Sequence, residues 1–131
     1  MNLSAEVLLA AKNLADAIKS DDRYAAAEAA GKAYSDDEMI STALTEYSVQ
    51  QQALTEEYGK EERDEALINA IQNRINEIYK DIVESPVYEA YKVASDEYQA
   101  YYRAVMEELE YQLTGKRSSC THDCSTCGGC H

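Results

Sequence analysis

The residues best suited to chemistry are gathered at the C-terminal end of the chain. The last fourteen residues read SSCTHDCSTCGGCH, and they hold all the cysteines and histidines of the chain: Cys120, His122, Cys124, Cys127, Cys130 and His131. The cysteines follow the spacing C-x3-C-x2-C-x2-C. Because crowded thiolates repel one another unless a cation, a proton or a covalent bond compensates them, this segment predicts a site for a soft metal centre.

The spacing of the cysteines favours one kind of metal centre over another. Structural zinc sites usually bring two short pairs of ligands together across a longer loop, and this run has no such loop. Cysteines at two-residue gaps match the compact spacing with which a chain wraps an iron–sulfur cluster, and Gly128 and Gly129 let the backbone approach the inorganic core. An iron–sulfur cluster on the four cysteines is the first prediction. The alternatives are zinc or another soft metal, with His122 and His131 as further ligands, and redox-active thiols.

Enzymatic uses of the same thiols fit less well. The stretch from Cys120 to Cys127 satisfies the C-x3-C-x2-C signature of radical S-adenosylmethionine enzymes, and Cys127-Gly-Gly-Cys130 resembles a thioredoxin-type pair. Both arrangements need a fold with strands, which the sequence does not predict. A glycine-containing tail is also a poor place to hold a cysteine nucleophile beside His122. The sequence therefore predicts a protein that is not an enzyme.

Charge and the N-terminal sequence restrict the partners and the compartment. The chain has 25 acidic and 12 basic residues, a formal net charge of −13, and no basic cluster beyond Lys116-Arg117. Direct binding to a nucleic acid backbone, which requires clustered cations, is not expected. The first residues show neither a basic leader region nor an apolar run long enough for a signal or a membrane span. We therefore expect a cytoplasmic protein, where thiols stay reduced and a disulfide staple is a poor explanation of the cysteines.

Helix-favouring residues dominate from Ser4 to Leu113, the single proline is Pro86, and alternating β-branched runs are missing. The pattern predicts an all-α fold, an elongated bundle of about five helices. Ser35 and Glu38 have the spacing of a capping box, which predicts a helix start at Ser35. Gly59 is placed to end that helix in a left-handed conformation, and Ser85-Pro86 predicts a break with an immediate restart. The expected helices cover about residues 5–19, 23–34, 36–58, 61–84 and 87–113.

Apolar periodicity predicts how these helices pack. Isoleucine recurs at three- and four-residue intervals in the fourth helix, at Ile68, Ile71, Ile75, Ile78 and Ile82, which requires a long partner helix. We expect the two long C-terminal helices to form an antiparallel pair in a helical domain of residues 1–115, followed by a Cys-rich metal-binding tail of residues 116–131. Because a flat bundle leaves part of a wide apolar stripe uncovered, the sequence also predicts a homo-oligomer, most simply a dimer.

Two further groups of residues have structural interpretations. The chain has eleven tyrosines and no other aromatic residue, and several lie on the predicted helix seams, where we expect packing or interface roles. Acidic clusters such as Asp36-Asp37-Glu38, Glu56-Glu57 and Glu61-Glu62 lack the Glu-x-x-His pairs of carboxylate metal sites in bundles. These clusters are predicted to be solvated helix surface.

The order of several motifs resembles that of a known family. These are the segments LADAIKS (14–20), the SDDE start at Ser35 and SPVYEAYKVASDEY (85–98), together with the Cys-rich end. In this order and at these distances they resemble the YlbF/YmcA family of small all-helical bacterial proteins, over about residues 4 to 113. The Cys-rich end is similar to the YlbF branch.

The resemblance implies a regulatory adaptor that performs no catalysis. It implies association with YmcA-like and YaaT-like partners in an assembly that carries iron–sulfur clusters and directs the endoribonuclease RNase Y toward certain transcripts. It further implies roles in competence, sporulation and biofilm formation. By position, only Cys120, Cys124, Cys127 and Cys130 become candidate cluster ligands.

Overall fold

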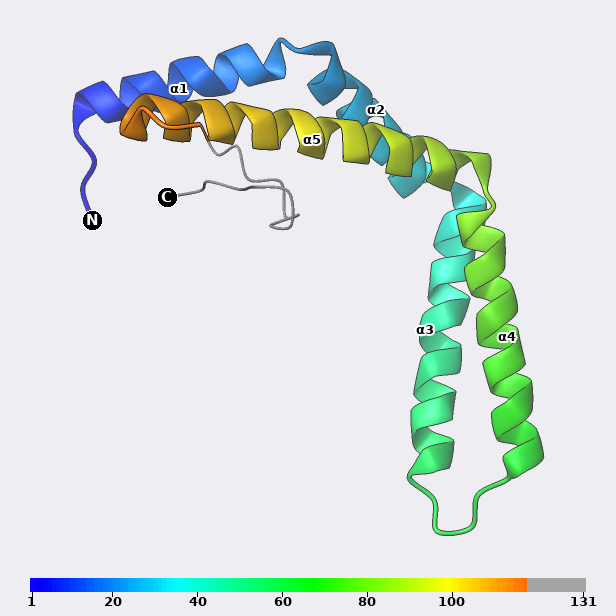
Figure 1. Ribbon diagram of the computed structural model, residues 1–131. Helices are drawn as coiled ribbons and strands as arrows, with labels where there is room; N and C mark the ends of the chain where they lie inside the picture. The colour runs from blue at the N-terminus through cyan, green and yellow to red at the C-terminus, as the bar shows by residue number, and fades with distance from the viewer. Residues whose placement is uncertain (118–131) are drawn as a thin grey trace, which may run out of the picture.

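The computed structural model describes residues 1–117 and shows an L-shaped arrangement of helices in that range (Figure 1). The helices are α1 (Ala5–Lys19), α2 (Asp22–Asp36), α3 (Glu38–Tyr58), α4 (Glu65–Val83) and α5 (Pro86–Thr114). The all-α class with five helices is confirmed. Among these helices, none has the length and apolarity that crossing a bilayer requires.

Every described helix begins at a serine or aspartate whose side chain accepts a hydrogen bond from a backbone N–H of the first turn. Such caps satisfy amide groups that have no partner inside the helix. The predicted break at Ser85 is confirmed, because Ser85 caps α5 and Pro86 occupies its first turn, where proline costs no hydrogen bond. The five capping residues are Ser4, Asp21, Asp37, Asp64 and Ser85.

Two of the predicted helix starts and the predicted conformation of Gly59 are wrong, while α3 does end at Tyr58, directly before Gly59, as predicted. Ser35 does not start a helix, because α2 continues to Asp36 and the side chain of Asp37 accepts the Ile40 N–H at 2.9 Å. Gly59 is right-handed, with φ −76°, and its N–H donates to the carbonyls of Thr55 and Glu56. The fourth helix begins after Asp64, which caps it, and not near residue 61.

The expected pairing of the two C-terminal helices is also corrected. α4 runs along α3 as an antiparallel hairpin, α5 runs along α2, and α4 meets α5 only around their connecting turn (Figure 1). The isoleucine stripe of α4 does have a long partner, and that partner is α3. The side chains of Ile68, Ile71, Ile78 and Ile82 are buried there.

The contact between α2 and α5 is built from tyrosines, as their positions on the helix seams predict. Tyr34 stacks on Tyr91 with ring centroids 4.8 Å apart, and Tyr24 meets the edge of Tyr98 at 5.6 Å. Such aromatic pairs stabilise a contact beyond the area that they bury. Neither α2 nor α5 contains a fully buried residue, so this pair of helices shares a seam and does not enclose a core.

The core of the described chain lies at the elbow, where the two arms of the L meet. Ile40 of α3 packs with Ile78 and Ile82 of α4, and Tyr34 of α2 and Tyr88 of α5 pack against them. Four helices therefore contribute to one small cluster. The same cluster fixes the direction of both arms.

Helix α1 is only weakly attached to the remainder of the fold. No Cα atom of α1 lies within 8 Å of a Cα atom of α5, and its contacts are with α2 around the connecting turn. Ile18, next to that turn, is buried. Farther from the turn, the apolar face of α1 is exposed at Val7 and Leu8.

Replacing Ile40 by alanine should strongly destabilise the fold, because Ile40 is fully buried where four helices meet. We expect a loss of about 2 to 5 kcal/mol in the free energy of unfolding, measured by urea denaturation followed by circular dichroism. Met39→Ala on the neighbouring, half-exposed residue is the control and should cost less than about 1 kcal/mol. Equal losses in the two variants would contradict an elbow core.

Candidate functional site

The residues predicted to bind a metal lie outside the part of the chain that the structure describes. These are Cys120, Cys124, Cys127 and Cys130 with His122 and His131. Their role stays a prediction from the sequence. What the structure does define is the point from which this segment leaves the helical domain.

That point is the end of α5. Gly115 adopts the left-handed conformation, with φ 70°, and its N–H donates to the Tyr111 carbonyl at 2.7 Å. The Arg117 guanidinium then lies over the Tyr111 ring, 4.1 Å from its centroid, and pairs with Glu108 at 3.2 Å. The chain is therefore turned back onto the last turns of α5 before the cysteines begin, on an exposed surface far from the elbow.

Within residues 1–117, no group of three or more His, Cys, Asp or Glu side chains is arranged to hold a metal ion. The carboxylates that do have shifted pKa values in this range are all shifted downward by hydrogen bonds to cations or amides: Asp21, Glu46, Glu57 and Glu108. The strongest case is Asp21, whose hydrogen bonds from Arg23 lower its pKa to about 2. A lowered pKa keeps a carboxylate ionised at neutral pH, whereas a carboxylate that serves as general acid needs a raised one.

The prediction that the acidic clusters are solvated is wrong for Glu57, which is only 4% exposed. Its carboxylate accepts hydrogen bonds from the Lys60 ammonium at 2.7 Å and from the Asp64 N–H at 2.9 Å. These two donors, Lys60 first, lower the pKa of Glu57. One carboxylate thus closes the loop between α3 and α4 and explains why α4 starts at Glu65.

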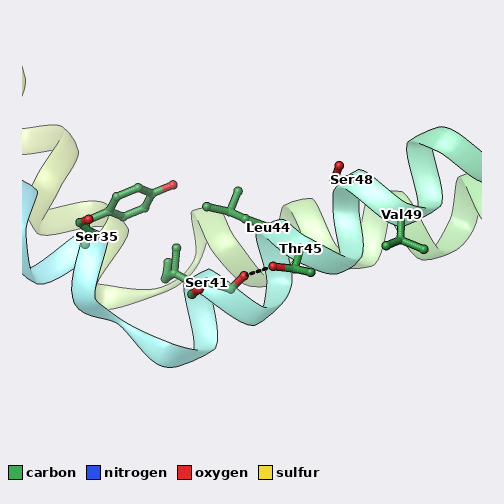
Figure 2. Close-up of a pocket in the computed structure, with 8 residues that line it drawn as sticks. Ser35, Ser41, Leu44, Thr45, Ser48 and Val49 are labelled. Atoms are coloured by element: carbon green, nitrogen blue, oxygen red, sulfur yellow. Dashed lines mark hydrogen bonds between the residues drawn. The ribbon is translucent and has the colours of Figure 1, made fainter.

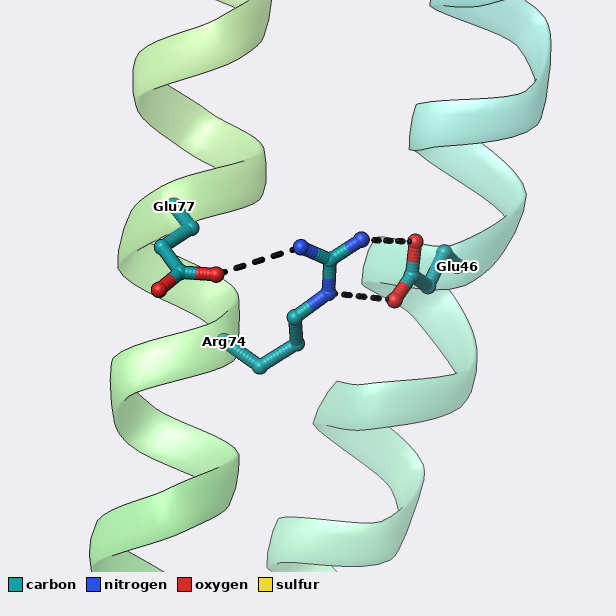
Figure 3. A network of polar contacts seen from close by, with 3 residues as sticks. All are labelled: Glu46, Arg74 and Glu77. Carbon is teal, nitrogen blue, oxygen red and sulfur yellow. Dashed lines mark hydrogen bonds and ion pairs between the residues drawn. The ribbon is translucent and has the colours of Figure 1, made fainter.

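Another ion pair joins α3 to α4 directly, nearer the elbow. The Arg74 guanidinium of α4 donates to both carboxylate oxygens of Glu46 on α3, at 2.6 and 2.7 Å, and also to Glu77 at 3.2 Å (Figure 3). This hydrogen bonding lowers the pKa of Glu46 and raises that of Arg74. A forked pair of this kind fixes geometry as well as charge, so it sets how α4 lies along α3.

One hollow of the described surface lies on the elbow side of α3. We call it the elbow groove. Its volume is about 570 Å³, and it is lined by Tyr34, Ser35, Ile40, Ser41, Leu44, Thr45, Ser48 and Val49 (Figure 2). No lining residue is charged. The Thr45 hydroxyl already donates to the Ser41 carbonyl at 3.0 Å, so its hydrogen is not free for a ligand.

Leu44 shows why periodicity alone missed this groove. The sequence places it in the stripe of α3 that should pack against a neighbouring helix, yet it is 44% exposed. Together with Tyr34 it also borders a second hollow of about 260 Å³, lined further by Tyr47, Tyr79 and Tyr88. The stripe of α3 is wider than α4 can cover. Its uncovered edge forms the wall of the groove.

The helical part of the chain matches one known family. A model of the family described as control of competence regulator ComK, YlbF/YmcA, matches residues 7–114, from the first turn of α1 to the last residue of α5. The family resemblance inferred from the order of the helix motifs is thereby confirmed. A search of curated proteins found none that matches the chain.

The role of Glu57 in closing the loop can be measured through pH. Because the folded state lowers the pKa of Glu57, its contribution to stability is present above the ordinary carboxyl pKa of about 4.5 and disappears as the pH falls through the lowered value. Glu57→Gln should therefore reduce the urea midpoint at pH 7, and the difference from the parent should shrink below pH 4.5. Glu62→Gln in the same loop is the control. An equal difference for Glu57→Gln at pH 7 and pH 2.5 would contradict this role.

Proposed function

The chain belongs to the YlbF/YmcA family, described as controlling the competence regulator ComK, and we propose that it is a non-enzymatic regulatory adaptor of the YlbF type. In this proposal it assembles in the cytoplasm with YmcA-like and YaaT-like partners. The assembly contains an iron–sulfur cluster and modulates RNA processing by RNase Y, and through it competence, sporulation and biofilm formation. The observation that carries the proposal is the family match over residues 7–114, which is nearly the whole helical domain.

The surface of the helical domain supports an assembling role. Large apolar side chains stay exposed along α1 and along the second half of α5, including Val7, Leu8, Leu109 and Leu113. Contiguous exposed apolar surface on a small domain is typical of a protein interaction site. The acidic balance of the chain supports contact with RNA through a partner, because phosphate binding requires clustered cations.

The sequence of the tail suits a cluster that a surface segment holds. Cys120, Cys124, Cys127 and Cys130 supply four thiolates, which is a full ligand set for one iron–sulfur cluster. Such a cluster would make the adaptor responsive to iron supply and oxidation. The helical domain contributes the anchoring of Arg117 on Tyr111, which holds the start of the segment against α5.

A second candidate function is metal handling, with the same tail binding zinc or another soft metal on a dimeric helical platform. The observation in its favour is that His122 lies between Cys120 and Cys124 and that His131 directly follows Cys130. Mixed thiolate and imidazole ligands are typical of zinc.

Metal analysis after anaerobic purification tests the proposal and separates the two candidates. We expect iron and acid-labile sulfide in near-equal amounts and a broad visible absorbance, because four thiolates are available to one cluster. The double variant Cys124→Ser, Cys127→Ser should lose both, while the control Ser125→Ala, which changes the same segment but no thiol, should keep them.

Two results would count against the cluster. Stoichiometric zinc without iron would favour the metal-handling candidate. Iron that survives replacement of all four cysteines would place the metal elsewhere and contradict the assignment of ligands.

A further inference from the structure

The elbow groove has no occupant from its own chain among the described residues. Its walls come from the end of α2 and from one face of α3, the face turned away from α4 (Figure 2). Leu44 and Val49 are exposed in it at 44% and 58%. Between them lie the small side chains of Thr45 and Ser48, which allow another helix to come close.

Helix α1 offers an apolar stripe that has no groove. Val7, Ala11, Leu14 and Ile18 recur at intervals of four, three and four residues, and Leu8 widens the stripe at its N-terminal end. Only Ile18 is buried, while Val7 and Leu8 are 50% and 54% exposed. The side chains of this stripe are therefore exposed to solvent toward the N-terminus of α1, over about the first two and a half turns of the helix.

The two surfaces cannot meet within one chain. Helix α2 lies between α1 and the elbow, and its fifteen residues span about 22 Å as a rigid rod. Figure 1 shows the N-terminal end of α1 at the free end of its arm, away from the elbow. An α1 helix that fills an elbow groove must therefore belong to another molecule.

Charge indicates that this other molecule is a second copy of the chain. Two copies with a net charge of −13 repel each other, so they can associate only through surfaces with little net charge. The groove has no charged lining residue, and residues 39–55 of α3 contain one charged residue, Glu46, which pairs with Arg74 of α4. Residues 1–15 contain Glu6 and Lys12 and have no net side-chain charge.

We propose that two copies of this chain pair reciprocally, with the N-terminal half of each α1 lying in the elbow groove of the other. The inference rests on the proposed role as an assembling adaptor and names the surface through which two copies join. The exposed part of α1, Ala5 to Asn13, spans about 12 Å, and the groove face of α3 from Ser41 to Val49 also spans about 12 Å, so their lengths match. Because each copy supplies one helix and one groove, the contact closes at two copies.

Three exposed valines give a matched test by analytical ultracentrifugation. Val7 lies on α1, Val49 lies in the groove, and Val93 lies on the outer face of α5 with a similar exposure of 52%. The unmodified chain should sediment as a dimer at micromolar concentration. Val7→Asp and Val49→Asp should each raise the dimer dissociation constant at least tenfold, and Val93→Asp should leave it unchanged. A monomeric parent, or equal weakening by all three variants, would overturn the proposal.

Mixing two variants tests whether helix and groove meet across molecules. Val7→Lys and Val49→Glu should each be monomeric alone. Their mixture should form a dimer, because one contact then pairs the introduced lysine with the introduced glutamate and the other contact has both original valines. Failure to form this mixed dimer would overturn the reciprocal arrangement, even if both single variants are monomeric.

Measuring iron on the same samples separates this inference from the proposed function. A dimer that is weakened by the substitutions at Val7 and Val49 but contains no iron would support the docking surface and contradict the iron–sulfur cluster. A monomeric protein that contains iron would support the cluster and contradict the docking surface.

Discussion

Ile40, Ile78 and Ile82 form the contact on which the remaining architecture depends, because four of the five described helices meet at this cluster. Away from it, α2 and α5 share a seam of half-buried tyrosines and contain no buried residue. The elbow therefore fixes the directions of both arms. It also turns Leu44 to the outside, so the bend that makes the core also makes the groove.

A fold with so small a core leaves much apolar surface exposed to water. The charges of the chain determine which other molecules can cover that surface. The ion pairs of Arg74 with Glu46 and of Lys60 with Glu57 lie between or beside α3 and α4, where they hold the hairpin together. The elbow groove on the other side of α3 has no charged lining residue, so these ion pairs hold the hairpin together without placing charge in the groove.

Local patterns predicted the elements and failed where the outcome depended on contacts between them. The isoleucine stripe of α4 indicates that a partner is needed, but several helices satisfy that need, and the sequence does not distinguish α3 from α5. Ser35 and Asp37 both suit an N-cap, but Ser35 lies in the last turn of α2 and Asp37 caps α3. Glu57 looks like surface because its partners, Lys60 and the Asp64 N–H, become neighbours only when the loop closes. The two candidate sites differ in the same way. The cysteine spacing can be read from the sequence, whereas the groove forms only when the helices pack.

The position of Arg117 connects the two halves of the functional argument. Arg117 follows the end of α5, and the C-terminal end of α5 and the N-terminal end of α1 both lie away from the elbow, at the free end of their arm (Figure 1). In a reciprocal pair each free end meets the elbow of the other copy, so the two cysteine segments begin at opposite ends of the dimer. A cluster shared between the two segments would have to bridge that separation. Because each segment carries four thiolates, each can supply a complete ligand set alone, and the dimer would present two separate centres to its partners.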